Sequence, residues 1–244
     1  MTASGQGRTL ILAHRATMGH APENSLAGLR AGLAVGLDGF EIDVRITADG
    51  VPVLLHDEDL SRTTSGSGLV SSHTLASIRS LKGEGGEPIP TLAQVLAVVG
   101  GRAALMIELK GGAEQDPAAL VDAVMEEVGG HDAAARVWLW SFDAGILTIA
   151  AQRSLAVPVA HLCRELDTDV LNRVDALGLA GVALHGSAAR AEVVARLRSE
   201  GLATFVWTVN EPAHLSRMAR LDLSGIVTDY PERARAALQV VAQS

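Results

Sequence analysis

The stretch FEIDVRITADGVPVLLHD, residues 40–57, sets ionisable side chains among some of the most apolar residues of the chain. Its branched and aliphatic residues are typical of β-structure. Side chains alternate between the two faces of a strand, so Glu41 and Asp43 share one face. Two carboxylates and His56 therefore interrupt segments that would otherwise belong to a packed core.

The dipeptide Asp49-Gly50 divides this stretch into two strands, because it is typical of a tight hairpin turn. With these two residues as the loop, position 48 pairs with position 51, and Asp43 stands directly opposite His56. A loop of another length would shift this register. We expect the hairpin to fold the histidine back onto the acids, while the other face carries Val44, Ile46, Val53 and Leu55.

Further short runs of β-branched and aliphatic residues alternate with longer segments of helical periodicity, which indicates β-α units in a parallel sheet. Eight such strands favour a closed barrel, and residues 51–57 add a ninth strand as a hairpin extension after the second. The expected barrel strands are 9–13, 39–44, 104–109, 137–142, 157–162, 181–185, 204–209 and 225–229.

The expected helices include 24–35, 117–128, 143–153, 189–200, 212–220 and 231–241. Three of them begin with proline at the first helical position, after Asp116, Glu211 and Tyr230, where the missing N–H has no intrahelical partner to lose. A chain of 244 residues with 48% hydrophobic content is long enough for one α/β barrel. We therefore expect residues 1–244 to form a single domain.

Charge and cysteine content exclude several classes of protein. The formal charge is −8 and basic clusters are absent from the sequence, which argues against nucleic-acid binding. Cys163 is the only cysteine, so an intrachain disulfide and a cysteine metal cluster are excluded. No run has the length of a signal core or a membrane span. We expect a cytoplasmic protein without stable membrane insertion, and the sequence is compatible with a homo-oligomer.

Parallel barrels place their active sites at the carboxyl ends of the strands, so polar residues there should converge. Three carboxylates in one place repel one another unless a cation neutralises them. Oxygen ligands without cysteine suit Mg²⁺ or Ca²⁺. The polar and aromatic residues in question are His14, Arg15, Glu41, Asp43, Glu108, Lys110 and Trp207.

The charges of this group point to a ligand class. Three carboxylates, one divalent cation and the cations of Arg15 and Lys110 leave a small positive charge, which a singly charged phosphodiester complements. His14 and His56 could act as general acid and general base on opposite sides of the phosphorus. The metal would polarise one phosphate oxygen and the Arg15 fork would bind another.

Eight motifs, in this order along the chain, resemble the glycerophosphodiester phosphodiesterase family. They are AHR (13–15), APENS (21–25), FEIDVRITADGVPVLLHDEDLSRTTSGSG (40–68), IPTL (89–92), IELK (107–110), SFD (141–143), WTVN (207–210) and GIVTDYP (225–231).

The resemblance implies a TIM (β/α)8 barrel that hydrolyses a small-molecule glycerophosphodiester to sn-glycerol 3-phosphate and an alcohol, with one divalent cation. It also implies a role for each residue of the site. These are the acid/base pair His14 and His56, the metal ligands Glu41, Asp43 and Glu108, the phosphate-binding Arg15 and Lys110, and Trp207 on the glycerol side of the pocket.

One departure from the family pattern concerns the residue after Arg15, where Ala16 stands in place of the usual glycine. If the backbone there requires a positive φ, alanine costs about 1 kcal/mol, and if φ is negative the change is close to silent. Ser25 replaces the usual threonine after Pro-Glu-Asn and retains the hydroxyl.

Other functions fit parts of the same pattern. The chemistry could act on another diester such as a lysophospholipid, or the site could bind a metal and a phosphate ligand without turnover, which only Ala16 favours. Acidic strand ends also serve barrel enzymes that abstract protons from carboxylates or sugars. Arg15 could pair only with Glu23, and Trp207 could be core packing. The two histidines, with Arg15 and Lys110, favour the phosphodiesterase.

Overall fold

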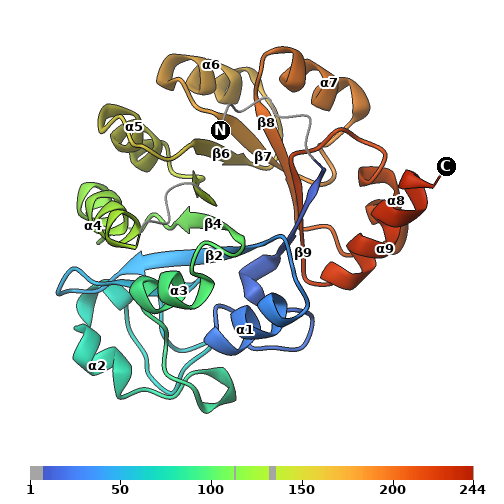
Figure 1. Cartoon of the computed structure of the whole chain (residues 1–244). Helices are drawn as coiled ribbons and strands as arrows, with labels where there is room; N and C mark the ends of the chain where they lie inside the picture. Colours follow the sequence, from blue (N-terminus) through green and yellow to red (C-terminus); the bar gives the residue numbers. More distant parts are fainter. Residues whose placement is uncertain (1–7, 113, 132–135, 244) are drawn as a thin grey trace.

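The computed structural model describes residues 8–112, 114–131 and 136–243. The expectation of a cytoplasmic location rests partly on the first seven residues, which lie outside these ranges. Within them, nine strands and nine α-helices alternate along most of the chain (Figure 1). The strands are β1 (Leu10–Ala13), β2 (Gly39–Ile46), β3 (Pro52–Leu54), β4 (Ala104–Leu109), β5 (Val137–Ser141), β6 (Val159–Cys163), β7 (Gly181–His185), β8 (Ala203–Trp207) and β9 (Gly225–Thr228).

The strands other than β3 close into a parallel barrel, because β1 pairs with both β2 and β9. Helices surround this ring in Figure 1. The structure confirms the expected TIM (β/α)8 barrel with a hairpin extension after the second strand. The helices are α1 (Leu26–Ala34), α2 (Leu75–Arg79), α3 (Leu92–Val99), α4 (Pro117–Gly130), α5 (Ala144–Gln152), α6 (Thr168–Leu177), α7 (Ala191–Ser199), α8 (Pro212–Met218) and α9 (Pro231–Ala242).

Local signals explain most helix boundaries. Proline occupies the first position of α4, α8 and α9, as expected. Three helices that we did not name among the candidates, α2, α3 and α6, also begin at recognisable caps. A capping box of Thr91 and Gln94 starts α3, and Asp167 caps α6. None of the helices in the described ranges combines the length and apolar character needed to cross a bilayer.

Two apolar layers hold the barrel together. The larger one packs the outer faces of the strands against the helices. The inner one consists of buried side chains that come from strands alone, among them Met106, Trp140 and Phe205. The interior is thus a packed core rather than a pore, and it forms a floor below the carboxyl ends of the strands.

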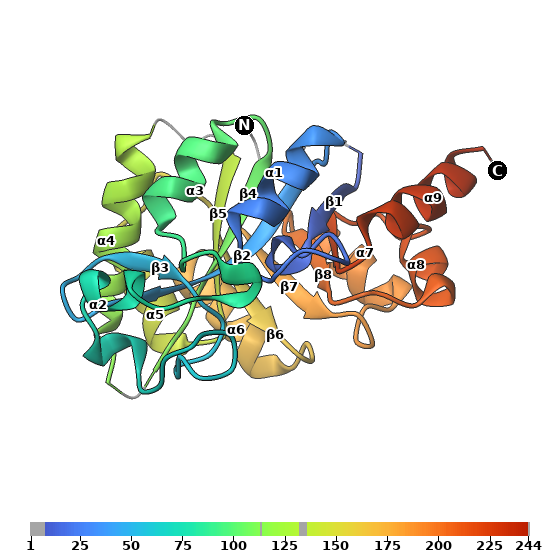
Figure 2. The ribbon, with the colours of Figure 1, turned by 90° about the horizontal axis from the view of Figure 1, so that it is seen from below.

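The segment between β2 and α3 forms its own small cluster beside the barrel, which Figure 2 shows at one side of the molecule. Its buried side chains are Val53, Leu55, Leu60, Val70, Ile78 and Ile89. This cluster anchors the chain that follows β3, where His56 lies.

The predicted hairpin register is wrong by one residue. Arg45 pairs with Val53 and Ile46 with Pro52, so Asp43 stands opposite Leu55, whose N–H donates to the Asp43 carbonyl at 3.2 Å. The turn has three residues, 48–50, with Gly50 at φ 80° in the left-handed position that such loops require. The side chain of Thr47 closes the turn by accepting from the Val51 N–H at 2.9 Å.

The shifted register also changes which side chains share a face. Val44 and Ile46 pack in the main core, as expected, and Leu54 joins them. Val53 and Leu55, which we placed with them, belong to the separate cluster of the extension. A slip of one residue exchanges the two faces of a strand, because side chains alternate with a period of two.

Candidate active site

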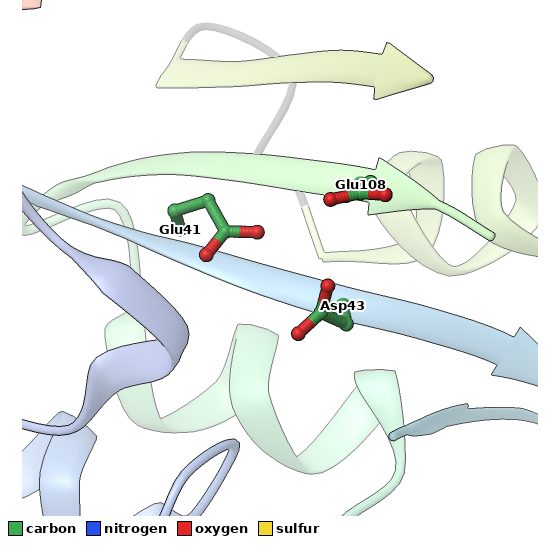
Figure 3. Close-up of side chains that lie close together, drawn as sticks. All are labelled: Glu41, Asp43 and Glu108. Atoms are coloured by element: carbon green, nitrogen blue, oxygen red, sulfur yellow. The ribbon is translucent and has the colours of Figure 1, made fainter. Parts of the chain in front are cut away.

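Three acidic side chains meet at the carboxyl ends of β2 and β4 (Figure 3). Asp43 and Glu108 are direct partners in the parallel register of these strands, and Glu41 lies two residues before Asp43 on the same face. All three are buried, and one carboxylate oxygen from each lies within 4.8 Å of the others. The structure therefore brings together the three residues that we expected to bind a metal.

Burial and mutual repulsion make these acids hard to ionise together. Burial, followed by the charge of Asp43, raises the pKa of Glu41 to about 8. The same two causes raise the pKa of Glu108. Burial also opposes ionisation of Asp43, but Lys110 and Arg15 outweigh it and lower that pKa. A site whose ligand atoms are all carboxylate oxygens fits a divalent cation such as Mg²⁺ or Ca²⁺, which would also offset the repulsion among the three acids.

Lys110 and Asn24 fix Asp43 and Glu108 in place. The Lys110 Nζ lies 3.0 Å from Asp43 Oδ1 and 2.6 Å from Glu108 Oε1. Asn24 donates through Nδ2 to Asp43 Oδ2 at 2.8 Å, and its Oδ1 accepts from the Asp43 N–H at 3.0 Å. This pair of hydrogen bonds sets the orientation of the Asp43 carboxylate. Lys110 adds a positive charge beside both carboxylates, and its expected role in phosphate binding stays a prediction.

Arg15 lies on the short turn that follows β1. Its backbone N–H donates to Glu41 Oε2 at 2.9 Å, and its Nη1 donates to Glu23 Oε2 at 2.9 Å. Its Nε lies 3.4 Å from Asp43 Oδ2. The pairing with Glu23 that we considered as an alternative is therefore real, but the guanidinium also faces the metal-ligand candidates.

Ala16, the departure from the family pattern, has a positive φ. The angle is 54° for Ala16 and 47° for Arg15, and the Ala16 side chain is fully buried. A left-handed conformation costs an alanine about 1 kcal/mol relative to glycine. The turn nevertheless brings His14 and Arg15 to the site, so the surrounding structure holds the strained conformation.

The turn is held against α1 at close range. A Cβ built on Gly28 would lie 1.9 Å from the Ala16 carbonyl oxygen, so only glycine allows the helix to approach. Ser25 caps the same helix by accepting from the Gly28 N–H at 3.1 Å. The hydroxyl that Ser25 shares with threonine is the group that performs this function.

His14 is oriented from the last strand of the barrel. Its Nδ1 lies 2.7 Å from Asp229 Oδ1, and Asn210 donates to the other oxygen of Asp229 at 2.6 Å. Burial lowers the pKa of His14, but the Asp229 hydrogen bond and the nearby Glu41 charge outweigh it, so the pKa is raised overall. This histidine is therefore supported in its protonated form.

His56 follows β3 and is held through its backbone as well as its ring. Arg45 donates to the His56 carbonyl through Nε at 3.1 Å and Nη2 at 2.8 Å. The ring Nδ1 lies 2.6 Å from Asp57 Oδ1. Burial lowers the pKa of His56 despite the charges of Asp43 and Asp57. The contacts of Arg45 with the His56 backbone therefore position this histidine beside the acids. The predicted pairing of His56 with Asp43 across the hairpin does not, because Asp43 stands opposite Leu55.

Arg62 connects the carboxylate that binds Arg15 with the carboxylate that binds His56. It donates to Glu23 Oε1 at 2.5 Å and contacts Asp57 through Nε and Nη2. Glu23 binds Arg15 and Asp57 binds His56, so four side chains of alternating charge, Arg15, Glu23, Arg62 and Asp57, lead from one side of the site to the His56 ring. The Arg62 hydrogen bond is the main cause that lowers the pKa of Asp57.

Trp207 forms part of the opposite wall. Its Nε1 donates to the Ala183 carbonyl at 2.9 Å, and its ring meets Phe142 edge-on at 5.3 Å. The walls enclose a cavity of about 290 Å³. It is lined by His14, Arg15, Glu41, Asp43, His56, Glu108, Lys110, Trp140, Phe142, Leu162, Arg164, Trp207, Thr208 and Val227. All eight expected site residues are among them.

Sequence reasoning did not assign the residues that orient the site. Asn24, Asp57, Arg62 and Asp229 lie inside the motifs that we compared with the family, so the motifs were the available signal. Arg45 lies in one of the same motifs, two residues after Asp43 on the same face of β2, but nothing in its position predicted a contact with the His56 backbone.

Comparisons with known proteins agree with this geometry. The sequence profile of the glycerophosphoryl diester phosphodiesterase family matches residues 14–233. A glycerophosphodiester phosphodiesterase of Caldanaerobacter subterraneus is 31% identical over 237 residues, covering 92% of this chain and 96% of the relative. A protein of the same name from Bacillus altitudinis is 32% identical over 238 residues, covering 93% and 96%.

The same fold occurs in a solved phosphodiesterase from Oleispira antarctica in complex with the product sn-glycerol-3-phosphate. It superposes with a TM-score of 0.87 at 27% identity, covering 94% of this chain and 96% of that one. The family profile spans most of the sequence, and the acids, the two basic side chains Arg15 and Lys110 and the two histidines converge in one cavity, so the chain belongs to the glycerophosphoryl diester phosphodiesterase family.

Proposed function

We propose that this glycerophosphodiester phosphodiesterase releases sn-glycerol 3-phosphate and an alcohol by means of one divalent cation and a pair of histidines. Residues 1–244 would form one catalytic domain. The observation that carries the proposal is the cavity in which three buried carboxylates, two cations and two histidines converge. Each of these groups is common, whereas their combination suits the cleavage of a phosphodiester.

The cation, Mg²⁺ or Ca²⁺, would be held by Glu41, Asp43 and Glu108. When bound, it would polarise a non-bridging oxygen of the phosphate. Arg15 and Lys110 lie beside the acids and would bind the remaining phosphate charge, with the Arg15 fork suited to two oxygens at once. The hydrogen bond from Arg15 to Glu23 would orient the guanidinium, and it is compatible with phosphate binding by Arg15.

The two histidines differ in a way that supports separate roles. In both, a carboxylate engages Nδ1 and leaves Nε2 for proton transfer. Asp229 is paired with neutral Asn210, whereas the charge of Asp57 is offset by Arg62. His14 would therefore carry the proton and give it to the leaving alkoxide, and His56 would accept a proton from the attacking group. That group would be either water, which gives sn-glycerol 3-phosphate directly, or the glycerol hydroxyl, which gives a cyclic phosphate that water then opens.

Trp207 would shape the glycerol side of the pocket. Its indole is fixed by the hydrogen bond to Ala183 and by the Phe142 ring. A rigid aromatic face suits the C–H groups of a small polyol, while the acids and histidines lie toward the phosphorus.

An assay of product release tests the proposal. We expect sn-glycerol 3-phosphate from glycerophosphocholine and glycerophosphoethanolamine in the presence of Mg²⁺ or Ca²⁺, and loss of activity with a chelator. His14→Ala and His56→Ala should each reduce kcat by about 10²-fold to 10⁴-fold with the fold retained by circular dichroism. Full activity in either variant would refute the histidine mechanism. Binding of intact diester without turnover would indicate a non-catalytic binder.

A further inference from the structure

The cavity has two chemically different sides. The side formed by β1, β2 and β4, together with His56, carries the ionisable residues of the proposed chemistry. The other side consists mainly of apolar and aromatic residues from β5 to β9. One lining residue there is charged, Arg164, which directly follows β6. Figure 1 shows β6, β7 and β8 as neighbours on this side of the barrel.

Arg164 lies beside the residue that would contact glycerol. Its guanidinium carbon is 5.8 Å from the centroid of the Trp207 ring. Within the described part of the chain, Arg164 forms no ion pair or hydrogen bond, unlike Arg15, Arg45 and Arg62. Its side chain is exposed at the mouth of the cavity, where a bound ligand could reach it.

A guanidinium has five N–H donors and no acceptor. A ligand that fills the space beside Trp207 removes water from Arg164 and must supply oxygen atoms in exchange, because burying an unpaired polar group is costly. The free hydroxyl groups of glycerol meet this requirement, while the C–H groups of the glycerol carbons would lie against the rings of Trp207 and Phe142. An acyl ester on the same glycerol takes away one of the two free hydroxyl groups and adds a methylene chain, which would lie against the guanidinium and keep water from its remaining donors.

We infer that Arg164 is a specificity-determining residue that binds the free hydroxyl groups of a deacylated glycerol and disfavours glycerol that carries an acyl chain. The inference rests on the proposed function, and it separates glycerophosphodiesters from lysophospholipids as substrates of the same site. Arg164 takes no part in proton transfer or metal binding, so it should act on substrate choice alone.

The test compares glycerophosphocholine with hexanoyl lysophosphatidylcholine, because the two share a head group and differ only by the acyl chain on glycerol. Bis(4-nitrophenyl) phosphate, which lacks glycerol, reports on the chemical groups alone. In Arg164→Met, we expect kcat/KM for glycerophosphocholine to fall about 10-fold, the size of a lost hydrogen bond to a charged group. The lysophospholipid should be cleaved as well as or better than by the unsubstituted protein, and the nitrophenyl ester should be unaffected.

Arg190→Met is the matched control. Arg190 is also exposed and precedes α7 at the same end of the barrel, but it pairs with Glu192 and does not line the cavity. All three rates should be unchanged in this variant, and both variants should keep the unfolding temperature of the parent.

The outcomes separate the two proposals. If the unsubstituted protein cleaves glycerophosphocholine but Arg164→Met leaves the preference between the two lipids unchanged, the role of Arg164 is overturned and the proposed function stands. If the unsubstituted protein cleaves none of the three esters with Mg²⁺ or Ca²⁺, both proposals fail. A preference for the lysophospholipid in the unsubstituted protein would also overturn the role of Arg164.

Discussion

His14 and Asp229 are 215 residues apart in the chain, yet His14 Nδ1 lies 2.7 Å from Asp229 Oδ1. The closure of the barrel brings them together, because Ala13 at the end of β1 pairs with Thr228 at the end of β9. Each residue of the contact directly follows one of these paired residues. The first and last strands thus complete one side of the site.

Removing the charge of Asp229 should lower the pKa of His14. Asp229 supports the imidazolium, so in Asp229→Asn the pH limb that reports loss of the His14 proton should move to lower pH. We expect kcat to fall about 10-fold as well, because the hydrogen bond from His14 then goes to a neutral amide oxygen in place of a carboxylate. A pH profile of kcat measures both effects. Asp122→Asn, which removes an exposed carboxylate paired with Arg153, should change neither; an unmoved limb in Asp229→Asn would contradict the assignment.

Arg62→Gln should shift the other histidine in the opposite direction. Without Arg62, the charge of Asp57 is no longer offset, so the pKa of His56 should rise and the acidic limb of the pH profile should move to higher pH. Glu23 and Asp57 would also lose their common partner. Arg153→Gln is a close control, because Arg153 has the same exposed fraction, 45%, and also binds a carboxylate through two nitrogens. Equal effects of the two variants on the pH profile would argue against the connection.

Metal binding should be visible as a gain in stability. A cation that binds only the folded protein raises the free energy of unfolding by about 2.7 kcal/mol at 100 times its Kd. Glu41→Gln should retain the fold without metal, because glutamine resembles the protonated carboxyl favoured by a pKa of about 8. We expect Mg²⁺ or Ca²⁺ to raise Tm in the parent and in Glu192→Gln, but much less in Glu41→Gln. An equal rise in all three would place the cation elsewhere.

Ala16→Gly should stabilise the protein by about 1 kcal/mol, because glycine adopts a positive φ without the steric cost that alanine incurs. The φ of Ala16 is 54°. Denaturant unfolding measures the change. Ala97→Gly, at an exposed position in the last turn of α3, should have the opposite sign, since glycine in a helix costs up to about 1 kcal/mol relative to alanine. A loss of stability in Ala16→Gly would show that the turn does not strain its alanine.

The sequence by itself determined the order of the strands, six of the nine helices in the described part of the chain and the residue types of the site. Apolar periodicity indicated the barrel, and proline at the first position marked three helices. Glu41, Asp43 and Glu108 could be placed together because parallel strands end at one edge of the barrel, a rule that needs no coordinates. His14, Arg15 and Lys110 followed from the same rule.

The tertiary structure alone decided how these residues are held. The hairpin register depended on whether the turn has two residues or three, and the dipeptide Asp49-Gly50 is compatible with both. The sign of φ at Ala16 depended on the packing of its turn against Gly28 of α1. The supports of His14 and His56 come from Asp229 and Arg45, whose contacts arise only when distant strands close and a side chain reaches past the end of its own strand. Local sequence fixes residue type and periodicity, whereas such contacts depend on the path of the whole chain.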